Sequence, residues 1–369
     1  MIRVLQVVTY MGRGGLETML MNYYRHIDRS KIQFDFLVHR EFRADYDDEI
    51  EELGGRIYRL PVLNPFSRVY KKALSSIFDE HPEYQVIHVH QDCMSSVILK
   101  EAQKHGVKVR IAHSHNANQD HNMKYLLKLY YRRYIPQYST NLMACSEEAG
   151  KWMFGKHPFE VLNNAIDAKK YTFNREIRTD MRLKLNITED KILIGHVGRF
   201  NPQKNHEFLI DIFDAIQKKI PAMLLLVGDG NQRQAIEAKV KNLNLGDQVI
   251  FAGVRTDVAE LMQAMDVFVF PSNYEGLPVT LIEAQATGLP CLISDKVPIE
   301  CKKTDLVQQN LLSTGADAWA EAAIRIAKTE RRNTYEEIKA AGFDIEENAK
   351  RLQEFYLRAD AGEKKLCLY

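Results

Sequence analysis

Short apolar runs alternate along most of the chain with longer segments in which apolar residues are spaced as in a helix. Residues 2–9 form a near-continuous apolar run, which is typical of a parallel strand covered on both faces. After the loop MGRGG, the apolar residues of 16–27 recur every three or four positions, as on one face of an amphipathic helix. A strand that leads into a helix through a glycine loop opens a doubly wound α/β domain.

The alternation continues in two series, and 369 residues exceed one ordinary hydrophobic core, so two domains are expected. The first would comprise residues 1–168 plus the C-terminal helix 345–369, and the second residues 169–344. Each would be Rossmann-like, with ligands bound at the carboxyl ends of its strands in a cleft between the domains. Further expected strands are 32–38, 86–90, 108–113 and 141–145 in the first domain, and 192–197, 222–227, 248–252, 267–270 and 291–294 in the second.

Residues 266–290 predict a buried strand, a glycine-containing loop and a helix that begins at Pro278 and ends before Gly288. Free backbone N–H groups at such a helix start form a natural phosphate site. Two carboxylates, Glu275 in the loop and Glu283 in the helix, would border the same pocket. The alternative interpretation is that Glu275 caps the helix and Glu283 is a solvated helical residue.

Residue types that suit phosphate binding follow several of the strands expected in the second domain. Gly198, Arg199 and Lys204 follow the strand 192–197, and two cations on one loop can neutralise a diphosphate. Gly253 follows the strand 248–252, and its missing side chain would let a nucleotide base approach the backbone. Solvated surface cations are common, but their repetition on successive loops of one sheet favours a diphosphate site.

Composition excludes some classes of protein. Fifty basic and 49 acidic residues give a net charge of +1, which provides no electrostatic basis for general nucleic-acid binding. Five cysteines without a C-x-x-C pair indicate reduced thiols, and no apolar stretch approaches the roughly 18 residues that a membrane span needs. We therefore expect a cytoplasmic protein.

The segment 124–139 mixes leucines and tyrosines with Lys124, Lys128, Arg132 and Arg133. One interpretation is a core helix with a basic solvated side. The other is peripheral contact with the anionic inner surface of the cytoplasmic membrane, which would present a lipid-linked acceptor to the cleft.

Two H-x-H pairs lie at expected strand ends, His88 with His90 and His113 with His115. Alternate residues on a strand share a face, so a hydrolase metal site is an alternative interpretation of these pairs. No comparable set of carboxylates accompanies them, and we expect hydrogen-bonding roles and no metal. The D-x-D triplet at 45–47 lies in the acidic run ADYDDEIEEL, where we expect a solvated helix rather than a metal site.

The ordered segments HVGRFNPQKN, LLLVGDG, VIFAGVRTDVAELMQAMDVFVFPSNYEGLPVTLIEA and TGLPCLISD resemble retaining glycosyltransferases of family 4, which have the GT-B architecture. The first half is similar more loosely, through GGLET, IAHSHN and NNAID. The resemblance implies transfer of a hexosyl or N-acetylhexosaminyl group from a nucleotide-diphosphate sugar, with UDP as the expected nucleotide. The acceptor would be a glycan or lipid-linked glycan in capsular or exopolysaccharide synthesis, and no cofactor would be needed.

Carried over position by position, the resemblance also implies roles for individual residues. Arg199 and Lys204 would hold the donor diphosphate and stabilise the leaving nucleotide. Glu275 would bind hydroxyls of the transferred sugar, His113 would contact that sugar at the reaction centre, and Asn164 would lie near the acceptor. The remaining positions would border the donor nucleotide or its phosphates: Gly14, Gly15, Gly198, Gly253, Val254, Gly276, Leu277 and Glu283.

The mechanism implied is front-face attack with retention, in which the leaving diphosphate acts as base. Two alternative functions would use the same diphosphate–sugar site. A nucleotide-sugar epimerase of the same architecture would need a base that removes a sugar proton and would use no acceptor. A non-catalytic nucleotide-sugar binding subunit would have less need for Glu275, Glu283, Arg199 and Lys204 together.

Overall fold

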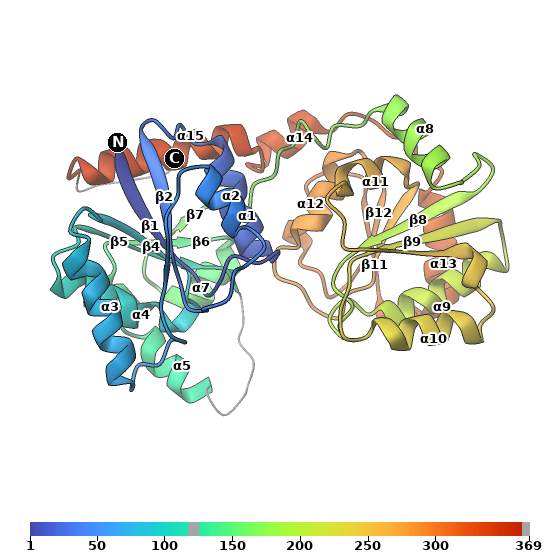
Figure 1. The fold of residues 1–369 in the computed structure, drawn as a ribbon. Coiled ribbons are helices and arrows are strands. Elements are labelled where there is room, and N and C mark those ends of the chain that lie inside the picture. Colours follow the sequence, from blue (N-terminus) through green and yellow to red (C-terminus); the bar gives the residue numbers. More distant parts are fainter. Residues whose placement is uncertain (117–124, 364–369) are drawn as a thin grey trace. The chain divides into compact units, whose positions relative to one another are not determined.

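The computed structural model describes residues 1–116 and 125–363, and the chain forms two compact units (Figure 1). The first unit comprises Met1–Ala165 with Asp344–Tyr369, and the second comprises Ile166–Phe343. The sequence places these boundaries at 168/169 and 344/345. Each unit contains one sheet of parallel strands with helices packed on it, which confirms the expected pair of Rossmann-like α/β domains.

The sheet of the first unit has the strand order β3-β2-β1-β4-β5-β6-β7. Its strands are β1 Ile2–Val7, β2 Ile32–Val38, β3 Ile57–Arg59, β4 Val86–Val89, β5 Val109–Ser114, β6 Asn141–Ala144 and β7 Glu160–Val161. Its helices are α1 Gly15–His26, α2 Asp47–Glu52, α3 Arg68–Glu80, α4 Ser95–Lys104, α5 Tyr125–Arg132, α6 Ile135–Tyr138, α7 Glu147–Phe154 and α15 Ile345–Asp360. Separate apolar clusters fill the two faces of the sheet, so the central strands β1 and β4 are buried on both.

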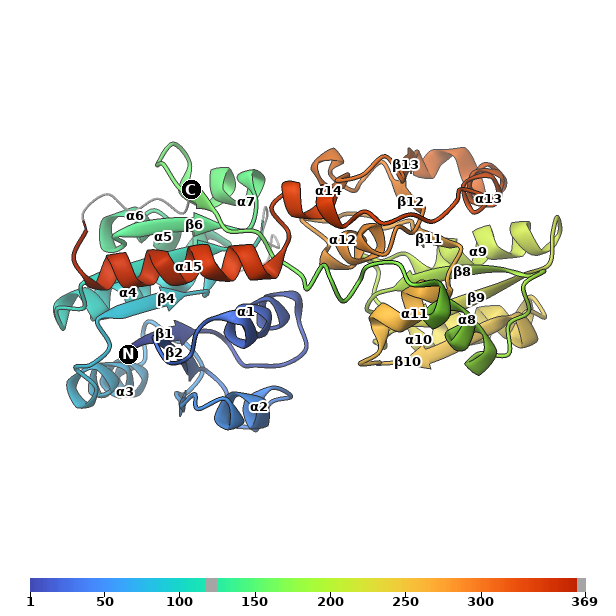
Figure 2. The same cartoon turned by 90° about the horizontal axis from the view of Figure 1, so that it is seen from above.

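Helix α15 returns the end of the described chain to the first unit, where it packs beside α1 (Figure 2). Asp344 caps its start by accepting a hydrogen bond from the Glu347 amide. Buried side chains recur along the helix at positions 345, 348, 349, 352, 355, 356 and 359, as expected for one apolar stripe. The stripe places Tyr356 in the core, with its ring 5.9 Å from that of Phe34.

The sheet of the second unit has the order β10-β9-β8-β11-β12-β13. Its strands are β8 Ile192–Val197, β9 Ala222–Val227, β10 Val249–Gly253, β11 Val267–Phe270, β12 Cys291–Ser294 and β13 Val307–Asn310. Its helices are α8 Arg175–Lys184, α9 His206–Gln217, α10 Arg233–Asn242, α11 Val258–Ala264, α12 Val279–Ala286, α13 Gly315–Ile326 and α14 Tyr335–Ala340. Because β8 and β11 are neighbours, the loops that follow them leave the same edge of the sheet side by side.

Two expectations about acidic residues are wrong. The run at 44–53 does form α2, but Asp47 is buried and accepts a 2.5 Å hydrogen bond from Arg59 instead of facing solvent. Asp257, with Glu260 three residues later, has the sequence pattern of a capping box at the start of α11, yet its side chain makes no capping bond. A nearby arginine competes for that carboxylate: Arg255 holds it through two bonds of 2.6 and 2.8 Å and lowers the pKa of Asp257.

The basic segment 124–139 contains α5 and α6, while Lys124 lies outside the described residues. No side chain of α5 is buried, and Leu126 and Tyr130 are 78% and 49% exposed. The interpretation of a core helix is therefore wrong for α5. No helix in the described part of the chain is long and apolar enough to cross a membrane.

Candidate active site

Two loops of the second unit are bound together at the carboxyl ends of β8 and β11. The Asn273 amide donates to the Gln203 carbonyl at 2.8 Å, and its side chain donates to the Pro202 carbonyl at 2.7 Å. In the opposite direction, the Asn205 side chain donates to the Pro271 carbonyl at 3.1 Å. These three bonds fix the positions of the side chains that project from the two loops.

Lys204 and Glu275 meet where the loops join. Lys204 Nζ lies 2.7 Å from Glu275 Oε1 and 4.6 Å from the centre of the Phe270 ring. Gln203 Nε2 donates to the other oxygen of Glu275 at 3.1 Å. The Lys204 and Glu275 side chains are only 14% and 4% exposed, so the pair is largely shielded from water. Helix α12 begins at Val279, and its N-cap residue is Pro278 with no side-chain capping bond, so the interpretation of Glu275 as a helix cap is wrong.

Glycines bring the backbone of this edge close together. A Cβ on Gly198 would lie 2.9 Å from His196 Nε2, and one on Gly228 would lie 2.2 Å from the Gly198 carbonyl oxygen. Gly228 has φ +131°, a conformation that side chains disfavour. Next to this turn, Arg199 is exposed and makes no ion pair with any residue that the structure describes.

The loop before α12 has free backbone donors. Among the described residues, no hydrogen bond satisfies the N–H groups of Gly276 and Leu277. Gly276 is exposed, and Leu277 is partly buried. A loop with free N–H groups at a helix start is suited to an anion or to the oxygen atoms of a sugar.

Glu283 lies in α12 and is held from another segment. Tyr171 donates its hydroxyl hydrogen to Glu283 Oε1 at 2.8 Å, and burial raises the pKa of Glu283. The interpretation of Glu283 as a simple solvated residue is therefore wrong.

The end of β10 contains the residues expected to border the base. Gly253 has φ +68°, and its carbonyl accepts a 2.8 Å bond from the Gly228 amide. The neighbouring Val254 is 63% exposed, which leaves an apolar surface free for contact.

In the first unit, Gly14 and Gly15 lie at the exposed start of α1. The Glu17 carboxylate folds over this start, because a Cβ on Gly14 would lie 2.2 Å from Glu17 Oε2. Burial raises the pKa of Glu17. Asn164 is 8% exposed, and its Oδ1 has no hydrogen-bond partner within residues 1–116 and 125–363.

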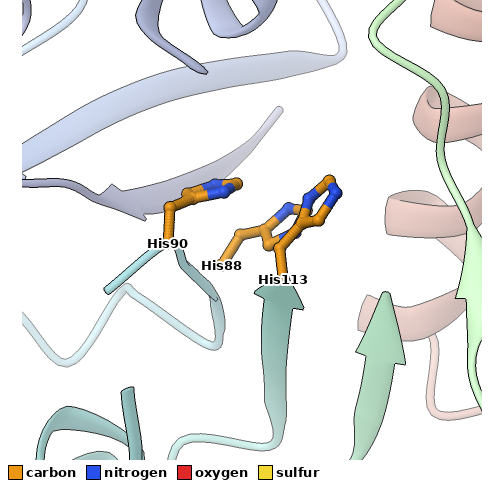
Figure 3. Close-up of side chains that lie close together, drawn as sticks. All are labelled: His88, His90 and His113. Atoms are coloured by element: carbon orange, nitrogen blue, oxygen red, sulfur yellow. The ribbon is translucent and has the colours of Figure 1, made fainter. Parts of the chain in front are cut away.

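His113 belongs to a cluster of imidazoles at the ends of β4 and β5 (Figure 3). His113 Nδ1 lies 3.1 Å from His88 Nε2, and His90 Nδ1 lies 2.8 Å from His115 Nε2. Burial lowers the pKa of His88 and His115 to about 3 and those of His90 and His113 well below their usual range, so all four rings are neutral.

His88, His90 and His113 each have a nitrogen within 4.8 Å of the others, which is close enough for a shared metal ion. The rings are stacked, however: the planes of His88 and His113 differ by 14° and those of His88 and His90 by 30°. A metal lies in the plane of each ring that binds it, so nearly parallel rings are poorly oriented for one ion. Hydrogen bonding between the rings fits this geometry better.

Both halves of the chain match families of known proteins. Residues 13–170 match Glycosyltransferase Family 4, and residues 177–344 match Glycosyl transferases group 1. The putative glycosyltransferase EpsF of Bacillus subtilis (strain 168) is 38% identical over 96% of each chain. The chain belongs to the family 4 glycosyltransferases.

More distant relatives also match this glycosyltransferase over almost its full length. The capsular polysaccharide biosynthesis glycosyltransferase CapH of Staphylococcus aureus is 23% identical over 97% of this chain and 99% of its own. The crystal structure of Anabaena Alr3699/HepE in complex with UDP and glucose has a TM-score of 0.78 at 16% identity, covering 97% of this chain and 100% of the other. This likeness confirms the expected GT-B fold.

The sequence did not single out several residues that hold the glycosyltransferase's site together. Gln203 lies beside Lys204 in the quoted motif, and its polar side chain was a usable signal. Tyr171 had no such signal, because it is 112 positions away from Glu283. Gln6 and Tyr356, which contact the histidine cluster, are 350 positions apart.

Proposed function

We propose that this glycosyltransferase transfers a hexosyl or N-acetylhexosaminyl group from a UDP-sugar, with retention and without a metal, to a glycan or lipid-linked glycan acceptor in capsular or exopolysaccharide synthesis. The observation that carries the proposal is the shielded pair of Lys204 and Glu275 beside the unpaired Arg199. The two cations suit the diphosphate of the donor, and the carboxylate suits the hydroxyl groups of its sugar.

When the donor binds, the ion pair between Lys204 and Glu275 would be partly replaced by contacts of each residue with the donor. The diphosphate attracts the Lys204 ammonium, and Arg199 is free to bind the same anion in bidentate fashion. Glu275 then loses part of its ion pair and gains hydroxyl donors from the transferred sugar, while Gln203 still holds its second oxygen. The free amides of Gly276 and Leu277 lie on the same loop as Glu275.

The chemical step breaks the bond between the anomeric carbon and the diphosphate oxygen. The acceptor oxygen bonds to the same face of that carbon, and its proton passes to the leaving diphosphate. Arg199, Lys204 and the start of α12 stabilise the charge that develops on the leaving group, the role that a metal ion has in other transferases.

The relatives support the choice of substrates. HepE is described in complex with UDP and glucose, and CapH is named for capsular polysaccharide biosynthesis. For the acceptor, the exposed face of α5 with Leu126 and Tyr130 would rest on the inner membrane surface beside Lys128 and Arg133. Flotation with anionic liposomes tests this contact, and binding that survives charge reversal of Lys128, Arg132 and Arg133 contradicts it.

A thermal-shift screen of nucleotides and nucleotide sugars in EDTA tests the donor site. UDP should raise the unfolding midpoint of the wild type, because it binds only the folded state. Lys204→Ala should abolish this rise. The control Lys218→Ala removes an exposed lysine that pairs with Asp214 on α9 and should keep the full rise.

Turnover then separates the enzyme from a binding subunit. Slow release of UDP and free sugar from the matching nucleotide sugar identifies a transferase that uses water as a poor acceptor. Conversion of the sugar without release of UDP identifies an epimerase, and no shift with any nucleotide contradicts the proposal.

A further inference from the structure

Gln6 connects the histidine cluster with Tyr356 through its side-chain amide. It is fully buried in β1, between the strands β2 and β4. Its Nε2 donates to the Tyr356 hydroxyl at 3.3 Å, and its Oε1 accepts from His90 Nε2 at 3.0 Å. The two ends of an amide differ, because the nitrogen only donates and the oxygen only accepts. Gln6 therefore imposes opposite directions on the two hydrogen-bond chains that leave it.

The first chain runs through Tyr356 to His113. The Tyr356 oxygen accepts from Gln6, and its hydroxyl hydrogen points to His88 Nδ1 at 2.6 Å. His88 then carries its proton on Nε2 and donates it to His113 Nδ1 at 3.1 Å. The neutral His113 ring must carry its own proton on Nε2.

The second chain runs from the amide oxygen to His115. His90 donates its Nε2 proton to Gln6, so His90 Nδ1 has a free lone pair. That lone pair accepts the Nε2 proton of His115 at 2.8 Å. The outer nitrogen of His115, Nδ1, is left as an acceptor.

The outer nitrogens of both chains are buried and have no hydrogen-bond partner in the described part of the chain. His113 and His115 lie two residues apart at the end of β5, with ring centres 4.1 Å apart. Burial lowers the pKa of all four histidines, so each ring has one proton and its tautomer is defined. A buried donor and a buried acceptor without partners are costly, which points to a ligand that supplies both.

We propose that Gln6 and Tyr356 are positioning residues that hold His113 and His115 in the same tautomer, with the proton on Nε2. Because the outer nitrogen is Nε2 in His113 and Nδ1 in His115, β5 ends in one N–H donor and one lone-pair acceptor. A hydroxyl group is the ligand that accepts one hydrogen bond and donates another. Reversal of the Gln6 amide would exchange the two roles but would keep them opposite. The assignment of that hydroxyl to the sugar of the donor rests on the proposed function.

Nitrogen-15 NMR of the full chain labelled at histidine tests the tautomers directly, since protonated and unprotonated ring nitrogens have well-separated shifts. In the wild type, His113 and His115 should both carry their protons on Nε2, which is the outer nitrogen of His113 and the inner nitrogen of His115. Assignment uses His113→Gln and His115→Gln. Different tautomers at the two positions overturn the proposal, and so does a change in all four rings on addition of EDTA, which would reveal a bound metal.

Two variants test the control by Gln6 and Tyr356. Gln6→Glu replaces the donor end of the amide by an acceptor, so the first chain should reverse and move the His113 proton from Nε2 to Nδ1, with His115 unchanged. Tyr356→Phe removes the hydroxyl and should leave His113 in a mixture of tautomers. Tyr70→Phe is the matched control, because it removes a buried hydroxyl that bonds to His39 elsewhere in the same unit. Variants that fold and keep a single unchanged His113 tautomer overturn the proposal.

A titration separates this inference from the proposed function. Addition of UDP-glucose, compared with UDP alone, should shift the outer nitrogens of His113 and His115 in the wild type. If the two rings have the same tautomer but the sugar shifts neither signal, the positioning role stands and the sugar assignment of the proposed function fails.

Discussion

The two polar groupings of this glycosyltransferase differ in charge and in how the chain assembles them. In the second unit, Lys204 and Glu275 are charged groups on loops, and their neighbours in the motifs support them. In the first unit, the histidine cluster is neutral, lies at strand ends, and depends on Gln6 and Tyr356, which are 350 positions apart. One region can stabilise charge, and the other can only orient hydrogen bonds.

The largest difference between the two units should be in the stability that each loses on acidification. Histidines whose pKa is lowered by burial are His39, His88, His90, His113 and His115 in the first unit, and His196 and His206 in the second. A lowered pKa gives stability that is complete above the unfolded value, about 6.5, and is lost as pH falls towards the folded value. For each proton that a unit takes up on unfolding, its free energy of unfolding falls by about 1.4 kcal/mol for every unit by which the pH is lowered. The first unit should therefore lose more stability.

The two tryptophans make this measurable, since Trp152 belongs to the first unit and Trp319 to the second. Urea unfolding of Trp319→Phe reports the first unit, and unfolding of Trp152→Phe reports the second. Between pH 7 and pH 5, the midpoint reported by Trp152 should fall further. Equal falls would show that the cluster does not dominate the acid response.

Lys204→Ala should have the next largest effect and acts on the charged region alone. Loss of one group that stabilises the leaving diphosphate lowers kcat by about 10²–10³-fold. The substitution leaves Tyr356 and the histidines untouched, so the NMR tautomers should be those of the wild type. Steady-state kinetics with the donor found in the thermal-shift screen gives the answer. A fall in kcat of less than about threefold would remove Lys204 from the proposed mechanism.

A smaller effect is expected where glycine backbone supports the charged region. Gly228→Ala forces a side chain to φ +131° and within 2.2 Å of the Gly198 carbonyl oxygen, which should cost about 2–4 kcal/mol. Gly276→Ala is the control, because its Cβ would meet nothing within 4 Å. Urea unfolding of the Trp152→Phe chain compares them. Equal stability of the two variants would mean that the turn at Gly228 relaxes freely.

The same contrast explains which features the sequence could predict. Apolar periodicity located β8, β9, β11 and β12 within one residue, because each is a short run buried on both faces. It missed β3, β7 and β13, which have two to four residues and are only partly buried; in β13, only Val307 is buried. Apolar periodicity does not identify strands that are both so short and so little buried.

Residues of the candidate site divide in the same way. Arg199, Lys204 and Glu275 could be named because they lie in recognisable motifs, although Gln203 and Lys204 reach Glu275 across 72 and 71 positions. The partners Tyr171, Gln6 and Tyr356 could not, because only the folded chain brings them to Glu283 and the histidines. The capping bond expected for Asp257 failed for a local reason, namely the competing Arg255.

The smallest effect concerns Glu283. Its pKa is shifted in the opposite direction to those of the histidines, so its contribution to stability changes with pH in the opposite direction. Burial raises the pKa of Glu283, so the folded state favours the protonated form. Its contribution to stability is complete below the unfolded value, about 4.3, and is lost as pH rises through the folded value. Glu283→Gln removes this titration and keeps an oxygen for Tyr171, so it should stabilise the second unit slightly at pH 7 and not at pH 4. Urea unfolding reported by Trp319 at both pH values, with the exposed Glu321→Gln as control, measures the difference. A Glu283→Gln variant that is less stable than the wild type at pH 7 would show that the Tyr171 hydrogen bond outweighs the cost of burying the charge.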